Sequence, residues 1–351
     1  MKSICKEVYY FKHSLLRGII SILFRFINFK PLQVNYYWNS KLNNKLIQIE
    51  KYFNPDLVYC HLIRTAEYGK NYKNKNVLAF QISHTLNYKR LLSNSKRLKI
   101  KLLYGLEHAL VKMYENKIIN YFNKNLFISK HDTKLLKINN IKNDKIFYSP
   151  HGIDTNYFSQ ENVNSNVLQE ENSILFPADF SPATNREAAD WLINDIFKEL
   201  KKYNPEIKLL LIGRNPPKHF FEMSRIDKNI EVSGYVKDIR PYFKRATIVV
   251  DPVRSCAGLQ NKILCSLSMK RAVVATNEAN EGLDIPNEII TCPDDNSSSA
   301  FVENIIFLLN NIDFRKKKEN LGRKYVTSYW TWSYHFNQLE QMFLKTFDKN
   351  E

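Results

Sequence analysis

Short runs of apolar residues alternate along this chain with longer segments in which apolar residues recur every three or four positions. The short runs are typical of buried strands, and the longer segments are typical of amphipathic helices. In the first half we predict strands at Glu7–Phe11, Asp56–Cys60, Val77–Ile82, Asn125–Ile128 and Lys145–Tyr148. Helices are predicted between them at residues 14–28, 39–53, 87–122 and 130–138.

The second half repeats this alternation. We predict strands at Ser173–Phe176, Lys208–Ile212, Ile230–Val232, Thr247–Val250, Ala272–Ala275 and Ile289–Cys292. Helices are predicted at residues 185–202, 238–244, 259–270, 297–311, 313–328 and 332–346. Strands and helices that alternate in this way form a parallel sheet with helices on both faces. Two such halves predict an α/β protein with two Rossmann-like domains.

The segment Ser149-Pro-His-Gly152 separates the two halves, because Pro and Gly interrupt both helices and strands. We therefore expect a first domain over residues 1–150 and a second over residues 151–331. Open parallel sheets bind ligands at the carboxyl ends of their strands. Candidate chemistry is accordingly expected directly after each predicted strand.

The net charge of +17 is confined to the first half of the chain. Residues 1–150 contain 27 Lys and Arg against 8 Asp and Glu, a balance of +19, whereas residues 151–351 have a balance of −2. An AT-rich genome would inflate Lys throughout, but it would not restrict the excess to one half. The asymmetry indicates an anionic surface or ligand: acidic lipid, phosphate or nucleic acid. Nucleic acid is disfavoured, since no RNP motif, zinc finger or helix-turn-helix is present.

The five cysteines are scattered and include no CxxC pair. This usage disfavours a zinc site or a disulfide framework and favours a reducing cytosol. The most apolar early segment, Leu15–Phe29, contains Arg17 and Arg25 and is too short to cross a bilayer. No secretory signal is visible. We therefore predict a cytoplasmic location.

The predicted helix over residues 14–28 has one apolar face, with Arg17, Ser21, Arg25 and Asn28 away from it. The apolar face consists of Leu15, Leu16, Ile19, Ile20, Leu23, Phe26 and Ile27. Two interpretations stay open: the helix packs on the sheet of its own domain, or it lies in the interface of a membrane. The basic segment 89–101 is in the same half and suggests peripheral docking of that half on the anionic inner face of the membrane.

The most informative segment for chemistry runs from Asp251 to Cys265. A predicted buried strand ends at Val250, a loop with Gly258 follows, and a helix then begins. Free N–H groups at a helix start bind anions, and glycine lets a ligand approach the backbone closely. Lys262 lies in the first turn and would add a positive charge for a phosphate. An ordinary strand–loop–helix with a solvated lysine would show the same pattern.

Three further loops follow other predicted strands of the second half. Gly213 and Arg214 follow one strand, and Gly234 and Val236 follow the next and could present backbone groups to a planar base. Glu281 follows a third. Each also has a plain structural interpretation, with Arg214 as surface charge and Glu281 as a solvated loop carboxylate. Together the loops favour a phosphate or nucleotide site at one sheet edge.

The order and spacing of these segments match a known pattern, specifically over residues 150–332 and loosely over residues 30–150. The segments include Pro150-His-Gly-Ile-Asp-Thr-Asn-Tyr-Phe158, Gly234-Tyr-Val-Lys-Asp-Ile-Arg240 and Gly258-Leu-Gln-Asn-Lys-Ile-Leu264. They resemble the family 4, or group 1, retaining glycosyltransferases, which have the two-domain GT-B fold. The likeness is greatest to sugar transferases of exopolysaccharide gene clusters. The resemblance therefore implies a hexosyltransferase that transfers a sugar, with retention, to a glycan or lipid-linked acceptor.

The resemblance also implies which residues meet a UDP- or GDP-linked sugar in the second domain. The base would lie against Gly234 and Val236. The diphosphate would meet the amides of Gly258 and Leu259 together with Lys262, and Arg214 would add a further charge. Such enzymes use no metal ion or other cofactor, because the helix start and the cations stabilise the leaving diphosphate.

The remaining roles implied by the resemblance fall partly in the first domain. Glu281 would face the donor sugar, and His84 would be a polar contact to that sugar. His61 and Arg64 would lie on the acceptor side. The chain after Trp332, residues 332–351, would cross back to the first domain. A lone histidine is as often a hydrogen-bonded structural residue, and that interpretation stays open for His84 and His61.

Two residues depart from the pattern of that family. Cys265 stands where the family has a glutamate that accepts hydrogen bonds from both ribose hydroxyls, and a thiol is a poor acceptor. Ala178 replaces a glycine common after the strand Ser173–Phe176. We expect the cysteine to weaken donor binding roughly 10- to 150-fold.

The first domain is also expected to lack about sixty residues of its usual start, including a strand and a Gly-rich loop. Its sheet would then have an exposed edge, or a partner chain would cover that edge. Two alternatives to an active transferase follow. One is a catalytically impaired homologue that acts as a partner or scaffold subunit, and the other is a basic protein that binds membranes or nucleic acid.

Overall fold

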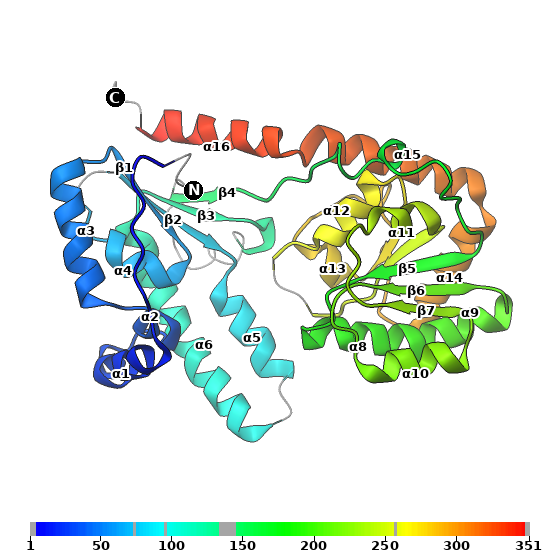
Figure 1. Cartoon of the computed structure of the whole chain (residues 1–351), viewed down its shortest axis with the longest axis horizontal. Coiled ribbons are helices and arrows are strands. Elements are labelled where there is room, and N and C mark those ends of the chain that lie inside the picture. Colours follow the sequence, from blue (N-terminus) through cyan, green and yellow to red (C-terminus); the bar gives the residue numbers. More distant parts are fainter. Residues whose placement is uncertain (1–4, 73–74, 95–96, 133–144, 256–257, 348–351) are drawn as a thin grey trace. The chain divides into compact units, whose positions relative to one another are not determined.

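The computed structural model describes residues 5–72, 75–94, 97–132, 145–255 and 258–347, and it divides into two units, Met1–Tyr148 and Ser149–Glu351 (Figure 1). The division falls at the start of the Ser149–Gly152 segment. A Cβ at Gly152 would lie 2.3 Å from the backbone nitrogen of Trp332, so glycine lets this segment pack closely against the start of the last helix. The N–H of Ile153 donates to the carbonyl of Trp330 at 2.7 Å.

The first unit is built on a four-stranded parallel sheet in the order β1-β2-β3-β4. The strands are β1 (Leu57–His61), β2 (Lys75–Gln81), β3 (Lys124–Phe127) and β4 (Ile146–Tyr148). Strand β2 is the most deeply buried, with Val77 and Phe80 fully inaccessible. Four of the five strands predicted for this half are thus confirmed, and β1 lies at one edge of the sheet.

The fifth predicted strand, Glu7–Phe11, is wrong, because these residues form no ladder in the described part of the chain. Their side chains are instead largely exposed: Tyr10 is 74% accessible. Aromatic residues favour a strand, but a strand also needs a neighbour with free backbone groups. The local composition does not indicate whether such a neighbouring strand is present.

The helices of the first unit are α1 (Leu15–Arg25), α2 (Leu32–Tyr36), α3 (Ser40–Phe53), α4 (Ala66–Gly69), α5 (His84–Asn94) and α6 (Leu98–Ile118). The single helix predicted over residues 87–122 is therefore wrong, because α5 and α6 are separate. Ser93 donates its hydroxyl to the carbonyl of Lys89 near the break, and Ser and Asn compete with helical backbone bonds. The helix predicted at 130–138 lies outside the described residues from 133 onward.

The second unit is built on a five-stranded parallel sheet in the order β7-β6-β5-β8-β9. Its strands are β5 (Ser173–Pro177), β6 (Lys208–Ile212), β7 (Ile230–Ser233), β8 (Ile248–Asp251) and β9 (Ala272–Ala275). All five were predicted. The predicted strand Ile289–Cys292 is reduced to one parallel bridge between Val274 and Thr291.

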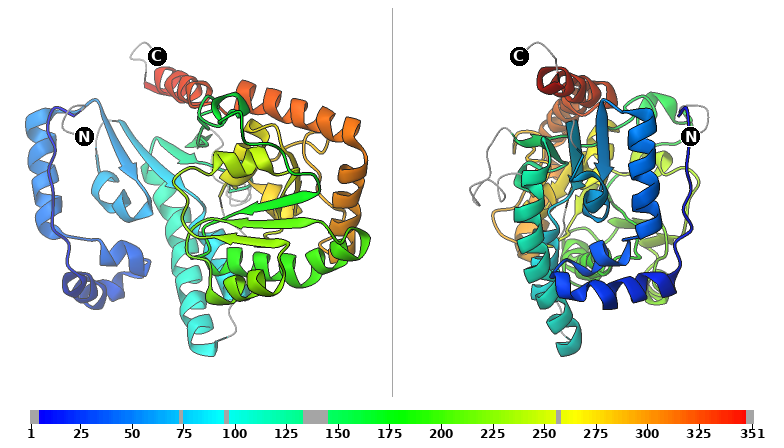
Figure 2. Two further views of the ribbon diagram at one scale, coloured as in Figure 1. Left: turned by 45° about the vertical axis from the view of Figure 1, so that its right-hand side comes forward. Right: turned by 90° about the vertical axis from the view of Figure 1, so that its left-hand side faces the viewer.

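Helices cover both faces of this sheet, as the repeated strand–helix pattern predicts (Figure 2). One core contains residues of α8 (Ala183–Trp191), α10 (Lys218–Ile226) and α14 (Ser298–Asn310). The opposite core contains residues of α11 (Arg240–Arg245), α12 (Asn261–Ser268), α13 (Asn277–Glu281) and α15 (Ile312–Tyr329). The two faces confirm the predicted α/β architecture with two Rossmann-like units.

The remaining helices of the second unit are α9 (Lys198–Tyr203), which continues α8 through a π-helical turn, and α16 (Trp332–Phe347). The expectation that residues 332–351 cross back to the first domain stays a prediction, and residues 348–351 lie outside the described chain. In the described part of the chain no helix combines the length and the apolarity that a membrane crossing requires.

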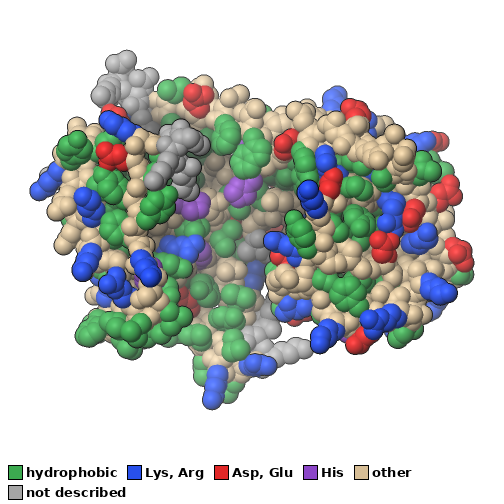
Figure 3. Space-filling model, in the orientation of Figure 1, with side chains coloured by type: hydrophobic (Ala, Val, Ile, Leu, Met, Phe, Trp, Pro, Cys, Tyr) green, Lys and Arg blue, Asp and Glu red, His purple; other side chains and the backbone are tan. Residues whose placement is uncertain are grey.

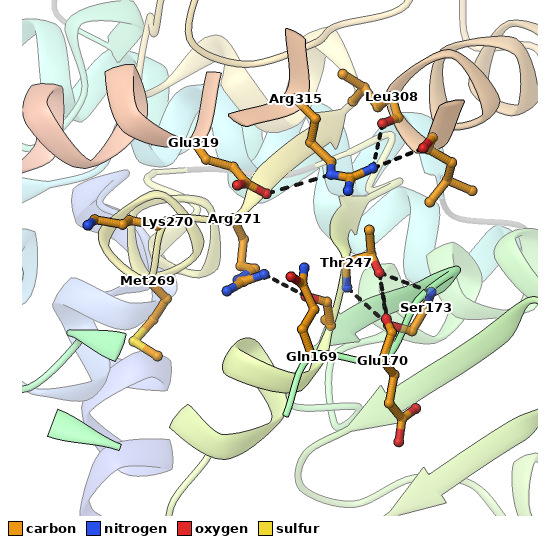
Figure 4. Close-up of polar contacts among 12 residues, drawn as sticks. Gln169, Glu170, Ser173, Thr247, Met269, Lys270, Arg271, Leu308, Arg315 and Glu319 are labelled. Atoms are coloured by element: carbon orange, nitrogen blue, oxygen red, sulfur yellow. Dashed lines mark hydrogen bonds and ion pairs between the residues drawn. The ribbon is translucent and has the colours of Figure 1, made fainter. Parts of the chain in front are cut away.

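Polar contacts close the amino edge of the second sheet (Figure 4). The buried guanidinium of Arg271 donates to the carbonyl of Ala246 at 3.0 Å. The hydroxyl of Thr247 donates to the carbonyl of Glu170, as does that of Ser173, so the starts of β5 and β8 are tied together. These hydrogen bonds lie at the amino edge, whereas the glycine-containing loops lie at the opposite, carboxyl edge.

Candidate active site

The loops that leave β5 and β6 pack tightly against each other at the carboxyl edge of the second sheet. Gly213 follows β6 with a φ of +147°, and a Cβ there would lie 1.9 Å from the carbonyl oxygen of Ala178. Ala178 in turn donates its N–H to the carbonyl of Ile212 at 3.0 Å. The close approach of these two loops thus requires glycine at 213, and it is compatible with alanine at 178.

Arg214 lies at this edge with an exposed side chain. Its guanidinium forms an ion pair with Asp179 at 2.9 Å, and its side chain is 62% accessible. Hydrogen bonds from Ser181 hold the pKa of Asp179 below its usual range. An exposed pair of this kind contributes little to stability, so Arg214 can exchange its carboxylate for a phosphate at small cost. Asp179 was not identified from the sequence.

Lys262 is held by a buried carboxylate. Its ammonium lies 3.0 Å from Oδ1 of Asp251, with the two side chains only 12% and 1% accessible. The same nitrogen lies 4.6 Å from the centre of the Phe176 ring and 3.4 Å from the amide oxygen of Asn185. Burial raises the pKa of Asp251, and the charge of Lys262 opposes that rise.

The contacts of Lys262 fix its position between the end of β8 and helix α8. Asp251 is the last residue of β8, and Asn185 lies on α8. Asp251 was not identified from the sequence as a site residue. A carboxylate at the end of a predicted strand was the signal that could have identified it. Asp251 thus positions the ammonium group that was expected to meet a diphosphate.

The start of α12 has the features expected of an anion site. Gly258 has a φ of +74°, a conformation that glycine adopts at little cost, and α12 begins at Asn261 after Gln260. The side chain of the cap residue Gln260 accepts no hydrogen bond from the first turn of α12. Leu259 packs against the core beside α12. Residues 256–257 of the predicted motif lie outside the described chain.

The loop after β7 leaves open space beside Gly234. A Cβ built on Gly234 would have no atom within 4 Å. Val236, two residues on, packs against the core, and Tyr235 between them is 73% accessible. The loop is therefore anchored at Val236 while Gly234 has room beside it. That arrangement suits a planar group lying against the backbone.

Cys265 and Glu281 come from α12 and α13 at the same edge. Cys265 is half-buried, and burial raises the pKa of its thiol to about 12. A neutral thiol accepts hydrogen bonds poorly, as the sequence analysis assumed. Glu281 is the last residue of α13 and is half-buried. Thr276 accepts a hydrogen bond from the N–H of Ala279 and so caps α13 directly after β9.

His84 is the first residue of α5 and is buried in the first unit. Its Nδ1 lies 3.5 Å from the side-chain nitrogen of Gln33, while its Nε2 has no hydrogen-bond partner in the described residues. Burial and the charge of Arg64 lower the pKa of His84 to about 4, so its ring is neutral at pH 7. A buried nitrogen without a partner is costly, and a water molecule or a ligand hydroxyl would satisfy it.

The other two first-unit candidates lie near the end of β1. His61 is the exposed last residue of β1, and its carbonyl accepts a hydrogen bond from the hydroxyl of Thr65. The guanidinium of Arg64 lies 4.8 Å from the centre of the Tyr37 ring. The charge of Arg64 also helps to lower the pKa of His84.

Glu115 was missed by the sequence analysis, although it supports His84 directly. Its carboxylate accepts hydrogen bonds from the N–H of His84 at 2.8 Å, the N–H of Thr85 at 3.2 Å and the hydroxyl of Thr85 at 2.5 Å. Glu115 lies on α6 and is fully buried. Burial raises its pKa to about 7, although the three donors oppose the rise. No local sequence signal connects residues 31 positions apart.

We predict that Glu115→Gln changes the pH dependence of folding. A carboxyl group whose pKa rises from 4.5 unfolded to about 7 folded stabilises the fold fully below pH 4.5 and loses that contribution as the pH rises through 7. His84 gives the free energy of unfolding the opposite dependence on pH. Its pKa is lowered in the folded state, so its contribution to stability is lost as the pH falls from 6.5 towards 4. The difference between wild type and variant isolates Glu115.

Urea unfolding at a series of pH values between about 4 and 8 measures this difference. The wild type should lose roughly 1–3 kcal/mol more than the Gln variant as the pH rises across this window. His84→Gln is the matched control and should remove the opposing slope. Parallel curves for wild type and Glu115→Gln would show that folding does not raise the pKa of Glu115.

Comparison with known proteins gives one family match and two curated relatives. Residues 171–311 match the model "Glycosyl transferases group 1". The chain is 24% identical over 300 residues to an uncharacterized 44.6 kDa protein in the cps region of Klebsiella pneumoniae, covering 80% of this chain and 71% of that protein. It is 28% identical over 194 residues to the capsular polysaccharide biosynthesis glycosyltransferase CapH of Staphylococcus aureus, covering 51% of this chain and 54% of CapH.

Solved structures agree with the fold. A glycosyltransferase from Rickettsia africae superposes with a TM-score of 0.66 at 18% identity, covering 88% of this chain and 81% of that one. HepE of Anabaena, in complex with UDP-glucose, superposes with a TM-score of 0.63 at 11% identity, covering 87% and 82%. These likenesses concern the fold alone, and they confirm the mixed α/β class with parallel sheets that the sequence predicted.

Proposed function

We propose that this chain, whose residues 171–311 match the group 1 glycosyltransferases, transfers a sugar from a nucleotide-sugar donor to a glycan or lipid-linked acceptor. The relative CapH is a transferase of capsular polysaccharide biosynthesis, and this supports a role in building a cell-surface polysaccharide. HepE has been solved with UDP-glucose, and this supports a UDP-linked donor. Retention of the anomeric configuration and a hexose as the transferred sugar belong to the same proposal.

The observation that carries this proposal is the cation and helix start beyond β8. Lys262, Gly258 with its positive φ and the uncapped start of α12 follow β8 at the carboxyl edge of a parallel sheet. Negative charge develops on a diphosphate when its bond to the sugar breaks. Fixed N–H groups and an ammonium group stabilise that charge without reorganising. These groups supply positive charge in place of a metal ion in the proposed mechanism.

The other residues of this edge take complementary roles in the proposal. The base lies against the backbone at Gly234, and the absence of any atom within 4 Å of a Cβ built there supports this role. Arg214 exchanges Asp179 for a donor phosphate. Glu281 accepts a hydrogen bond from the sugar. In the first unit, the free Nε2 of neutral His84 makes a hydrogen bond to a sugar hydroxyl, with His61 and Arg64 on the acceptor side.

The proposal is tested by the melting temperature of the whole chain with UDP-, GDP- and ADP-sugars. A ligand at 100 times its Kd stabilises the folded state by about 2.7 kcal/mol. We expect one nucleotide class to raise the melting temperature and transfer to occur with that class. If no nucleotide sugar stabilised the protein, the cradle beyond β8 would not be a donor site.

Cys265→Glu sharpens this experiment. A carboxylate at 265 would accept hydrogen bonds from both ribose hydroxyls, and nucleotide affinity should rise roughly 10- to 150-fold. Cys292→Glu is the matched control, because Cys292 is also a half-buried thiol against the same core but is not a residue of α12. The nucleotide affinity of Cys292→Glu should not rise above that of the wild type. Equal affinities for wild type and Cys265→Glu would mean that residue 265 does not face the ribose.

A second candidate is favoured by Cys265 itself. The thiol leaves the ribose without its acceptor, which is the change expected in a homologue that keeps the fold as a partner or scaffold subunit. Nucleotide binding without donor hydrolysis or transfer, for wild type and Cys265→Glu alike, would favour this candidate. Binding to membranes or nucleic acid without any nucleotide effect would favour the basic binding protein.

A further inference from the structure

Helix α1 is oriented with its small and polar side chains toward the protein. Gly18 is buried against the Tyr36 ring, where a Cβ would lie 2.1 Å from a ring carbon. Ser21 donates its hydroxyl to the carbonyl of Asn35 at 2.6 Å. This orientation is the reverse of the usual surface helix, which buries its apolar stripe.

The apolar face of α1 and of the turn after it is exposed. Its large side chains are 43% to 81% accessible, and none of them belongs to the hydrophobic core of the first unit. They are Leu15, Leu16, Ile19, Ile20, Leu23, Phe24, Phe26, Ile27 and Phe29. Figure 3 shows hydrophobic side chains gathered over α1. The sequence-based alternative, in which this face packs on the sheet of its own unit, is therefore wrong.

A second exposed apolar stripe lies at the start of α6. It consists of Leu98, Leu102, Leu103 and Leu106. Helix α1 and the start of α6 lie toward the same end of the first unit in Figures 1 and 2. Both helices belong to this unit, and the apolar stripes of both are exposed. An exposed apolar area of this extent marks an interaction site.

The charges around these helices identify the partner. Residues 8–49 contain six Lys and Arg and no Asp or Glu. Lys12 and Arg17 are exposed beside the apolar face, and Lys99 and Lys101 are exposed beside the second stripe. Half of the eight acidic residues of this unit are buried: Glu67, Glu107, Glu115 and Asp132. The surface around the apolar face is therefore more basic than the composition alone indicates.

An apolar face bordered by cations fits an anionic lipid surface. Helix α1 has 11 residues and a length of roughly 16 Å, far short of a hydrocarbon core of about 30 Å. A helix of this kind lies in the plane of the interface, with its apolar side chains below the headgroups and its cations among them. We propose that α1 and the start of α6 dock this chain on an anionic membrane surface.

The test is flotation of the full chain with vesicles of phosphatidylcholine, with or without phosphatidylglycerol. We expect binding only to the vesicles with phosphatidylglycerol, and its loss at high salt because screening weakens charge attraction. The variant L16E/L23E should bind at least about ten-fold more weakly, since it removes two apolar side chains and adds two negative charges. Both residues are exposed, so the melting temperature should not change.

The matched control is L168E/I226E, which makes the same chemical change at two exposed apolar residues of the second unit. It should bind vesicles like the wild type. K12E/R17E should weaken binding while keeping every apolar side chain of α1. Equal binding of wild type and L16E/L23E, or none to any vesicle, would overturn the proposal.

A second copy of this chain is the other candidate occupant of this face. Light scattering of the wild type and of L16E/L23E tests for such self-association. A dimer that becomes a monomer in the variant would assign the face to a second copy and overturn membrane docking. If the wild type and the variant are both monomers and the wild type binds vesicles, the result supports membrane docking. This proposal does not depend on the proposed function, because flotation and light scattering measure neither nucleotide binding nor sugar transfer.

Discussion

Lys262→Met is expected to lower the free energy of unfolding by roughly 3–5 kcal/mol and to abolish stabilisation by nucleotide sugar. The substitution leaves the carboxylate of Asp251, which is 1% accessible, without the cation 3.0 Å away. An unpaired buried charge is among the costliest defects in a protein core. Methionine keeps most of the side-chain volume, so the loss reflects charge and not packing. Urea unfolding and melting curves with and without donor measure both effects.

The double variant D251N/K262M separates stability from ligand binding. Removing both charges eliminates the unpaired carboxylate, and replacing a buried pair by neutral groups is often nearly neutral for stability. We therefore expect the double variant to recover most of the lost stability while remaining unable to bind donor. A double variant that bound nucleotide sugar like the wild type would show that the ammonium group of Lys262 serves the fold and not the diphosphate.

Gly213→Ala is expected to destabilise the second unit by roughly 2–4 kcal/mol. The added Cβ would lie 1.9 Å from the carbonyl oxygen of Ala178, and the φ of +147° is one that L-residues rarely adopt. The clash is with backbone, so no side chain can move aside to relieve it. The loops after β5 and β6 would separate, and Arg214 would move with them. Thermal unfolding should show a loss of roughly 5–15 °C.

Gly234→Ala is the control that the same sheet edge provides. A Cβ at Gly234 meets no atom within 4 Å, so the change in unfolding free energy should stay within about 0.5 kcal/mol. Donor affinity should nevertheless fall, because the methyl group occupies the space proposed for the base. Equal stability of the wild type and Gly213→Ala would mean that the two loops are further apart than the structure shows.

Much of the fold and part of the site followed from local patterns. All strands of the second sheet were predicted near their observed bounds, because short apolar runs between glycine and proline are distinctive. The loops at Gly213, Gly234 and Gly258 were identified because a parallel sheet gathers its strand ends at one edge. The strand at Glu7–Phe11 was wrong, since propensity cannot report whether a partner strand exists. The single helix at 87–122 was wrong because Ser and Asn near residue 93 compete with helical backbone bonds.

The sequence by itself determined two parallel α/β sheets, the edge of the second sheet at which the candidate loops lie and the basic character of the first half, because these depend on local periodicity and composition. Only the tertiary structure decided that Asp251 holds Lys262, that Glu115 supports His84, and that α1 turns its apolar face outward. These features depend on which distant side chains meet when the helices pack. A one-dimensional pattern shows that a helix has an apolar face, but packing decides which way that face points.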